Sequence, residues 1–164
     1  MPRLFVAVVP PDEVLDVIAA LPRPEAPGVR WTGRDQWHVT LRFLGEADVD
    51  DAVRALDGAT WARCRAELGP AVRRLGRNVL CVPAAGLDDL AGAVVEATAA
   101  VGRPPEKRPF RGHLTLARCR AKPPRDAVGR PVAAEFPVDA VHLIQSHLGG
   151  PHPARYELLH SFSM

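Results

Sequence analysis

A strand-like alternation of apolar and polar side chains surrounds one histidine in the first quarter of this chain. Side chains along a β-strand point to opposite faces in turn, so positions i and i+2 share a face. By this rule His38 and Thr40 lie on one face. Val39, Leu41 and Phe43 lie on the other, which is entirely apolar. The pattern predicts a strand that packs its apolar face on the core and presents an imidazole and a hydroxyl side by side.

The same alternation returns in the second half of the chain. His113 and Thr115 share one face, and Leu114 and Leu116 share the opposite, apolar face. The order histidine, aliphatic residue, threonine, leucine therefore occurs twice in 164 residues, although the chain contains only five threonines. Two such strands could bring two imidazoles and two hydroxyls around one small anionic group.

The segments that precede these two strands also repeat. The two histidines are 75 residues apart, and the β-rich apolar run at 3–8 has a counterpart at 78–83. Each run is followed by apolar residues at helical spacing, in the segments 14–21 and 87–94. The helical faces do not superpose residue for residue. The order strand, helix, histidine-bearing strand nevertheless indicates an internal duplication.

Periodicity and turn residues predict further elements in the rest of the chain. They are a helix over 49–56 capped by Asp48, a half-exposed strand over 62–68, a loop over 122–131 rich in Pro and Gly, and two strands over 138–148 and 155–163 joined by a turn at Gly149-Gly150-Pro151. We therefore expect an α+β fold. It would have two lobes of duplicated antiparallel sheet in quasi-twofold relation, helices on the outer faces, and a central cleft that receives one histidine strand from each lobe.

Composition bounds the class of protein without assigning its partner. Hydrophobic residues make up 47% of the chain, which is enough to bury a core and form one bilobal domain spanning 1–164. The net charge of +2 does not identify a partner. The three cysteines lack a C-x-x-C spacing, as expected for reduced intracellular thiols. No apolar run approaches the ~18 residues of a membrane span, and residues 1–9 lack the basic start of a signal peptide. We expect a cytoplasmic monomer with no membrane contact.

Two imidazoles that face each other suit acid–base chemistry at phosphorus. A neutral imidazole can take a proton from water, while an imidazolium delivers one to a leaving oxygen. In-line displacement places the attacking and leaving oxygens on opposite sides of phosphorus, so the acid and the base should approach from opposite directions. Threonine hydroxyls can donate hydrogen bonds to the non-bridging oxygens. Zinc sites instead use three or four His, Cys or carboxylate ligands. This set of two histidines and two threonines therefore favours phosphodiester cleavage without a metal or other cofactor.

Several stretches resemble the two-histidine phosphoesterase superfamily, and within it the bacterial and archaeal RNA 2′,3′-cyclic phosphodiesterases, also called the 2′-5′ RNA ligase family. They are R-L-F-V-A-V at 3–8, Q-W-H-V-T-L-R-F-L-G-E at 36–46, R-P-F-R-G-H-L-T-L-A-R at 108–118, and the closing segment 146–159. The resemblance covers nearly the whole chain. It implies a bilobal fold with both motifs in one cleft, which agrees with the duplication.

The resemblance also implies an activity and a role for each residue. The reaction would be hydrolysis of a terminal 2′,3′-cyclic phosphate of RNA to a 2′-phosphomonoester, with weak reverse joining to a 5′-hydroxyl. If the roles known in the family apply to this sequence, His38 would be the proton donor to the departing 3′ oxygen, and His113 would be the proton acceptor from water. Thr40 and Thr115 would hold phosphate oxygens, and Arg118 would add a positive contact. The duplication alone leaves the two histidines nearly equivalent.

The position of Arg118 poses a geometric problem. It stands five residues after His113, so strict alternation would turn its side chain away from the cleft. Either a bulge follows Thr115, or the arginine acts from the rim.

Other substrates and a non-enzymatic role stay open. The phosphodiester could be an ADP-ribose cyclic phosphate or a 2′-5′ oligoadenylate rather than an RNA end. The chain could also be a nucleotide- or RNA-binding module, although binding alone does not need an acid–base pair. The basic segment 103–111 could follow an RNA backbone or be an ordinary solvated loop.

Aromatic residues near the motifs are candidates for stacking on a base. Trp31 and Trp37 precede His38 and are the better candidates, whereas Phe5 and Phe43 on apolar strands are expected in the core. Tyr156 could serve either purpose. The remaining four histidines lack a threonine two places on, and His160 is expected in the core because of its apolar strand neighbours.

Overall fold

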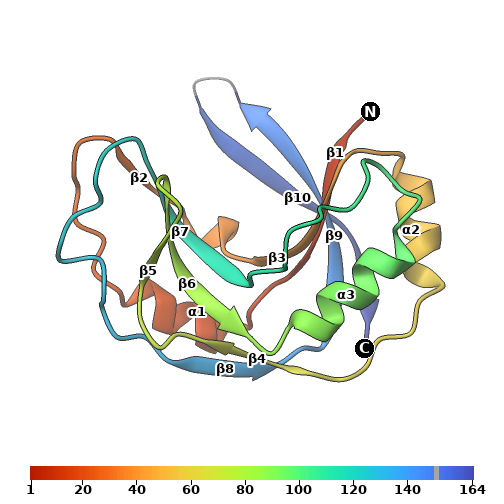
Figure 1. Cartoon of the computed structure of the whole chain (residues 1–164), viewed down its shortest axis with the longest axis horizontal. Coiled ribbons are helices and arrows are strands. Elements are labelled where there is room, and N and C mark those ends of the chain that lie inside the picture. Colours follow the sequence, from red (N-terminus) through yellow and green to blue (C-terminus); the bar gives the residue numbers. More distant parts are fainter. Residues whose placement is uncertain (150–151) are drawn as a thin grey trace.

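Ten β-strands join into one antiparallel sheet in the computed structural model, which describes residues 1–149 and 152–164. The strands are β1 (Arg3–Val8), β2 (Val29–Trp31), β3 (Val39–Glu46), β4 (Arg65–Leu68), β5 (Arg73–Leu75), β6 (Val79–Ala85), β7 (His113–Cys119), β8 (Ala134–Pro137), β9 (Ala140–Gly149) and β10 (His152–Ser163). Their order is β10-β9-β1-β3-β7-β6-β4-β8, with β2 beside β7 and β5 beside β6 (Figure 1). The C-terminal strands thus lie next to the N-terminal one.

The sheet divides at β3 and β7 into two half-sheets. The first half-sheet is β10-β9-β1-β3 and the second is β7-β6-β4-β8. The register between β3 and β7 consists of a single pair, Val39 and Leu114. The expected α+β class, built mainly of antiparallel sheet, is confirmed. The strand order is also consistent with the expected duplication into two lobes, since β1, a helix and β3 have counterparts in β6, a helix and β7.

Three α-helices pack against the sheet in the described part of the chain. They are α1 (Asp12–Ala19), α2 (Val49–Asp57) and α3 (Asp88–Ala97). Their buried residues, Ile18, Leu56 and Val94, belong to the same core cluster as Val39 and Leu114. In the described part of the chain, no helix is both long and apolar enough to cross a bilayer.

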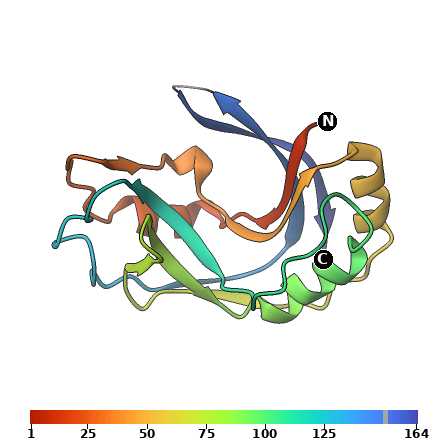
Figure 2. The same ribbon diagram turned by 45° about the horizontal axis from the view of Figure 1, so that its top comes forward.

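Two of these helices, α1 and α3, cross over between the half-sheets. Helix α1 follows β1 but packs by β8 of the second half-sheet, and α3 follows β6 but packs by β3 of the first (Figure 1). Figure 2 shows α2 and α3 together at one end of the molecule. Because α1 and α3 each pack on the other half-sheet, the two halves share one core.

The elements predicted from periodicity are present. Asp48 caps α2, since its carboxylate accepts a hydrogen bond from the backbone N–H of Asp51 at 3.0 Å. The segment 122–131 is a loop, as expected, and the expected turn at 149–151 falls mostly on residues 150–151, outside the described residues. The sequence analysis missed β2, β5, β8 and a single 3₁₀ turn, η1 (Arg34–Gln36). These pieces have three or four residues each, too few for a periodicity to emerge.

Candidate active site

The pairing of β3 with β7 brings the two histidine motifs together. Val39 and Leu114 are antiparallel partners, and both are fully buried on the core face. Continued by one residue on each side, this register places His38 across from Thr115, and Thr40 across from His113. All four side chains then share the face away from the core. The histidines lie on one diagonal of this four-residue group, and diagonal neighbours in an antiparallel pair are about 7–8 Å apart.

Both imidazoles are oriented by the same kind of hydrogen bond. Nδ1 of His38 lies 2.7 Å from the carbonyl oxygen of Gln36, and Nδ1 of His113 lies 2.8 Å from that of Arg111. Because a carbonyl oxygen only accepts, each Nδ1 carries the proton and donates it. The opposite nitrogen, Nε2, is thereby left for chemistry. In His38 it lies 3.0 Å from Oγ1 of Thr40, so the imidazole and hydroxyl of one motif converge.

His38 lies in an environment that favours its neutral form. Burial is the main cause, and the neighbouring His113 and Arg118 act in the same direction, so that together they lower the pKa of His38 to about 4. The hydrogen bond to Gln36 opposes this shift. The proximity of positive groups to His38 indicates a site prepared to accept an anion.

A bulge in β7 resolves the position of Arg118. The register with β6 shifts between Leu80 and Cys81, whose partners are Ala117 and Thr115, so Leu116 is left without a partner. Leu116 and Ala117 are consecutive yet both buried, and Arg118 is exposed. Of the two alternatives, the bulge after Thr115 is present. It reverses the alternation and returns Arg118 to the face of the histidines.

The first motif contains the same irregularity, which corrects the expectation for Phe43. In β3 the partners of Val6 and Ala7 are Arg42 and Thr40, so Leu41 is skipped. Leu41 and Arg42 are both buried, whereas Phe43 is 53% exposed. The prediction of a core position for Phe43 was wrong because it assumed unbroken alternation. Phe43 returns to the face of His38, as Arg118 returns to the face of His113.

Aromatic rings surround His38 on the side of β1. Phe5 is buried, as expected, and its ring centroid lies 4.9 Å from that of His38 and 5.3 Å from that of Tyr156. Tyr156 meets His38 edge to face at 5.2 Å. The stacking role predicted for Trp37 does not fit the structure, because its side chain is 2% exposed. Trp31 donates its indole N–H to the carbonyl of Pro24, so its polar edge is already engaged within the protein.

A pocket of about 610 Å³ opens beside His38. We call it the Tyr156 pocket; its walls include Arg34, Asp35, His38, Ile144, Tyr156 and Leu158. Apolar side chains dominate, and one arginine and one aspartate stand at its edge. His113 is not part of the wall, so the pocket extends from the His38 side of the four-residue group. Its size and lining suit a planar ring with polar edges.

Thr32 connects the two motifs, and sequence reasoning missed it. Its Oγ1 lies 2.9 Å from the carbonyl oxygens of both Thr115 and Leu116, at the bulge in β7, and donates to these acceptors. The same oxygen accepts a hydrogen bond from the indole N–H of Trp37 at 3.0 Å. Trp37 directly precedes His38. No motif marks Thr32, because its role depends on the pairing of β2 with β7.

The other described histidines of β9 and β10 make different contacts. His142 is within 2.8 Å of the hydroxyl of Ser161, and His147 is within 2.9 Å of a carboxylate oxygen of Glu157. His160 is exposed, contrary to expectation: it pairs with buried Leu143 and lies beside the ring of Phe162, but β10 is the edge strand of the sheet and leaves its side chain open to solvent. Within the described residues, no three His, Cys, Asp or Glu side chains gather as metal ligands.

The fold and this paired arrangement define a two-histidine site held between two half-sheets, and comparison with known proteins assigns the family. The model of the 2′-5′ RNA ligase superfamily matches residues 10–150. This chain belongs to that superfamily, whose members are two-histidine phosphoesterases. A search of curated protein sequences found no significant match.

Solved structures of similar fold agree with this assignment. The structure of TT0787 from Thermus thermophilus matches with a TM-score of 0.80 and 28% identity, over 98% of this chain and 97% of that chain. E. coli LigT in complex with 3′-AMP matches with a TM-score of 0.80 and 26% identity, over 99% and 98% of the two chains. E. coli LigT in complex with phosphate matches with a TM-score of 0.73 and 26% identity, over 99% and 96%.

Proposed function

We propose that this protein hydrolyses the 2′,3′-cyclic phosphate at the end of an RNA to a 2′-phosphomonoester, without a metal ion. The observation that carries the proposal is the pairing of the two motifs at Val39 and Leu114, which groups two imidazoles and two hydroxyls on one face. E. coli LigT has been crystallised with 3′-AMP and with phosphate, which supports a nucleotide with a phosphate group as the ligand of this site as well. Because both half-sheets contribute, we propose that residues 1–164 act as one catalytic unit.

In the proposed reaction, His113 takes a proton from water as the water oxygen attacks phosphorus. The bond from phosphorus to the 3′ oxygen breaks, and His38 donates a proton to that oxygen. The hydroxyls of Thr40 and Thr115 donate hydrogen bonds to the non-bridging oxygens, and the guanidinium of Arg118 stabilises their charge. The products are a 2′-phosphate and a free 3′-hydroxyl. The reverse step, with a 5′-hydroxyl in place of water, would join two strands through a 2′-5′ linkage.

The pKa of His38 is compatible with a donor role once the substrate is bound. In the free protein a pKa of about 4 leaves His38 neutral at pH 7. A cyclic phosphate carries one negative charge, and its arrival beside His38 favours the protonated form. The same charge offsets the effects of His113 and Arg118. We therefore propose that the bound substrate raises the pKa of His38, so that His38 takes up a proton from solvent before it acts as the acid.

The Tyr156 pocket is the proposed site of the terminal nucleoside. It opens on the side of His38, where the departing 3′ oxygen and its ribose would lie. Leu158 and Tyr156 offer apolar and aromatic surface to a base, while Arg34 and Asp35 offer polar groups to its edge. Arg34 is also paired with Asp16 at 2.7 Å.

The proposal is tested by the position of the phosphate in the product. The wild-type protein is incubated, in excess EDTA, with an oligoribonucleotide that ends in a 2′,3′-cyclic phosphate, and the product is followed by phosphorus NMR. We expect a 2′-phosphomonoester. A 3′-phosphate, or no product, would contradict the proposal. Parallel incubations with an ADP-ribose cyclic phosphate and a 2′-5′ oligoadenylate show which phosphodiester is preferred.

A further inference from the structure

Phe43 occupies the position in the first motif that Arg118 occupies in the second. Each residue stands five places after its histidine, and each follows a bulge that turns it back to the histidine face. One half of the site therefore presents a cation, and the other presents an aromatic ring that is 53% exposed. The reaction described above uses Arg118 but gives no task to Phe43.

The ring of Phe43 lies beside a second, buried aromatic ring on the histidine side of the sheet. Phe5, its partner on β1, lies 5.9 Å away between ring centroids. Phe5 is itself 3% exposed, so it forms a fixed support. A ring held from behind and open in front is a suitable surface for stacking a nucleobase.

The basic segment 103–111, which we call the basic loop, runs beside Phe43. The backbone N–H of Arg103 donates to the carbonyl of Leu44, the residue after Phe43, at 2.9 Å. The stem of Arg103 crosses Gly45 so closely that a Cβ on that glycine would lie 3.3 Å from its Cδ. Gly45 has φ = +70°, a conformation that favours glycine. The end of β3 and the start of the loop are thus in direct contact.

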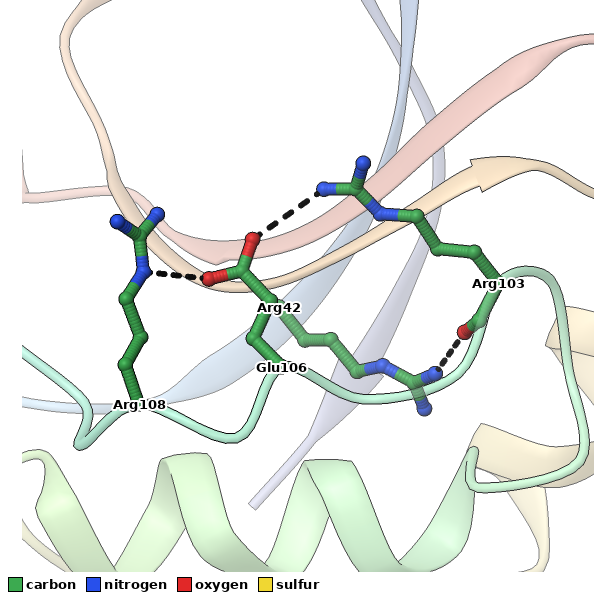
Figure 3. A network of polar contacts seen from close by, with 4 residues as sticks. All are labelled: Arg42, Arg103, Glu106 and Arg108. Atoms are coloured by element: carbon green, nitrogen blue, oxygen red, sulfur yellow. Dashed lines mark hydrogen bonds and ion pairs between the residues drawn. The ribbon is translucent and has the colours of Figure 1, made fainter.

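Buried Arg42 fixes this loop to β3. Its guanidinium donates to the carbonyl oxygen of Arg103 at 2.7 Å (Figure 3). It also donates to the carbonyl oxygen of Thr98 at the end of α3. Glu106 accepts hydrogen bonds from the guanidinium groups of Arg103 and Arg108 at 3.4 and 2.6 Å. Figure 3 shows these two arginines extending from the loop on the side away from α3.

The basic loop keeps an excess of positive charge despite Glu106. It contains two arginines bound to that carboxylate, together with Lys107 and Arg111, so four basic residues face one acidic residue. An aromatic ring beside a basic segment is the arrangement that binds single-stranded nucleic acid through stacking and phosphate contacts. The loop ends at Arg111, whose carbonyl holds Nδ1 of His113.

Phe43 and the Tyr156 pocket therefore lie toward different ends of the reacting group. The pocket opens at His38, whereas Phe43 follows Thr40 along β3, and the register places Thr40 across from His113. If His38 faces the departing oxygen, the attacking oxygen enters from the side of His113. Along β3, Phe43 lies beyond Thr40, the residue that the register places across from His113, and the basic loop ends two residues before His113.

We propose that Phe43 and the basic loop form a second nucleoside subsite, which binds a strand end that carries a 5′-hydroxyl. This inference rests on the proposed function. Hydrolysis does not use the subsite, because water is then the attacking group. When the subsite is filled, the 5′ oxygen attacks phosphorus, its proton passes to His113, and the bond to the 3′ oxygen breaks as that oxygen is protonated by His38. The product is a 2′-5′ phosphodiester with a free 3′-hydroxyl.

The test compares joining with hydrolysis in one reaction mixture. A nucleoside 2′,3′-cyclic phosphate is supplied with increasing amounts of a 5′-hydroxyl dinucleotide, and the ratio of joined to hydrolysed product is measured. Both products come from the same complex of enzyme and cyclic phosphate, so damage to the shared machinery cancels in the ratio. For Phe43→Ala we expect this ratio to fall roughly 10-fold or more at subsaturating dinucleotide, the size of one lost stacking contact. Phe43→Trp should retain it.

Leu148→Ala is the matched control. Leu148 is 67% exposed on β9 and belongs to neither proposed subsite, so the ratio should equal that of the wild type. An unchanged ratio in Phe43→Ala would overturn the inference, including the case in which both products decrease equally. Hydrolysis by the wild type with no joined product at saturating dinucleotide would overturn it as well. Absence of hydrolysis in the wild type would instead contradict the proposed function, so the two failures are distinguishable.

Discussion

The indole N–H of Trp37 donates a hydrogen bond to the hydroxyl of Thr32 at 3.0 Å, and through this contact the two histidine motifs are held in register. The hydroxyl in turn bonds the backbone at the bulge of β7, 2.9 Å from the carbonyl oxygen of Thr115. The backbone N–H of Thr32 also donates to the carbonyl of Leu116 at 2.8 Å. Thr32 thus joins the residue before His38 to the strand that contains His113.

Replacing this hydroxyl is expected to disturb the site more than the fold. In Thr32→Val, the indole N–H and a carbonyl lose their partner, at a cost of about 1–3 kcal/mol in unfolding free energy. A small misplacement of reacting groups lowers turnover steeply, so we expect kcat for a cyclic phosphate to fall roughly 10-fold or more. Thr32→Ser keeps the hydroxyl and should stay near the wild-type rate. Steady-state kinetics and denaturant unfolding measure the two effects.

Thr60→Val provides a control for the change of side chain, because Thr60 is exposed and lies outside the site. It should alter neither kcat nor stability. Equal rates in Thr32→Val and the wild type would show that the contact between the motifs is not needed for positioning.

The titration of His38 should depend on whether the site holds an anion. In the free protein, burial and the positive groups nearby place the pKa of His38 at about 4, below the value of 6.5 of an unperturbed histidine. A bound 2′-nucleotide brings negative charge to the imidazole and stabilises its protonated form, so the pKa should rise. Histidine NMR titration with and without 2′-AMP measures both values. A free His38 that titrates at or above 6.5, or one that does not respond to 2′-AMP, would contradict this account of the site.

The assignment of acid and base can be tested with a better leaving group. Sulfur in place of the bridging 3′ oxygen leaves as a thiolate and does not need a proton. If His38 is the acid, His38→Ala should be slow on the normal cyclic phosphate and recover most of its rate on the sulfur analogue. His113→Ala should be slow on both, because the attacking water still has to lose a proton. If His113→Ala, rather than His38→Ala, recovers its rate on the sulfur analogue, then His113 is the acid and His38 is the base.

The sequence was most informative where chemistry and periodicity coincide. The two tetrapeptides beginning at His38 and His113 repeat both a side-chain pattern and a set of reactive groups, so they predict two equivalent strands and one shared site. The apolar runs at 3–8 and 78–83 predict the flanking strands for a similar reason. An alternation or a β-rich apolar run of sufficient length is best explained by a β-strand.

Sequence reasoning failed where a single residue interrupts the period. The bulges at Leu41 and Leu116 reverse which residues share a face, and the three residues on either side of each bulge include no glycine or proline to mark the change. Phe43 was assigned to the core for this reason, whereas Arg118 revealed the possibility of a bulge because the family resemblance gives it a contact in the cleft, and strict alternation would turn it away. Thr32 could not be found, since its partners are distant in sequence and its strand has only three residues.

The central claim is that His38 and His113 act as one acid–base pair, and the most direct measurement is the turnover of a nucleoside 2′,3′-cyclic phosphate by His38→Ala, His113→Ala and the double variant. We predict that each single variant, with circular dichroism like that of the wild type, loses roughly 10²-fold or more in kcat. The double variant should be scarcely slower than either single one, because residues that act as a unit are not additive. A single variant that turns over at the wild-type rate, or losses that simply multiply in the double variant, would contradict the account.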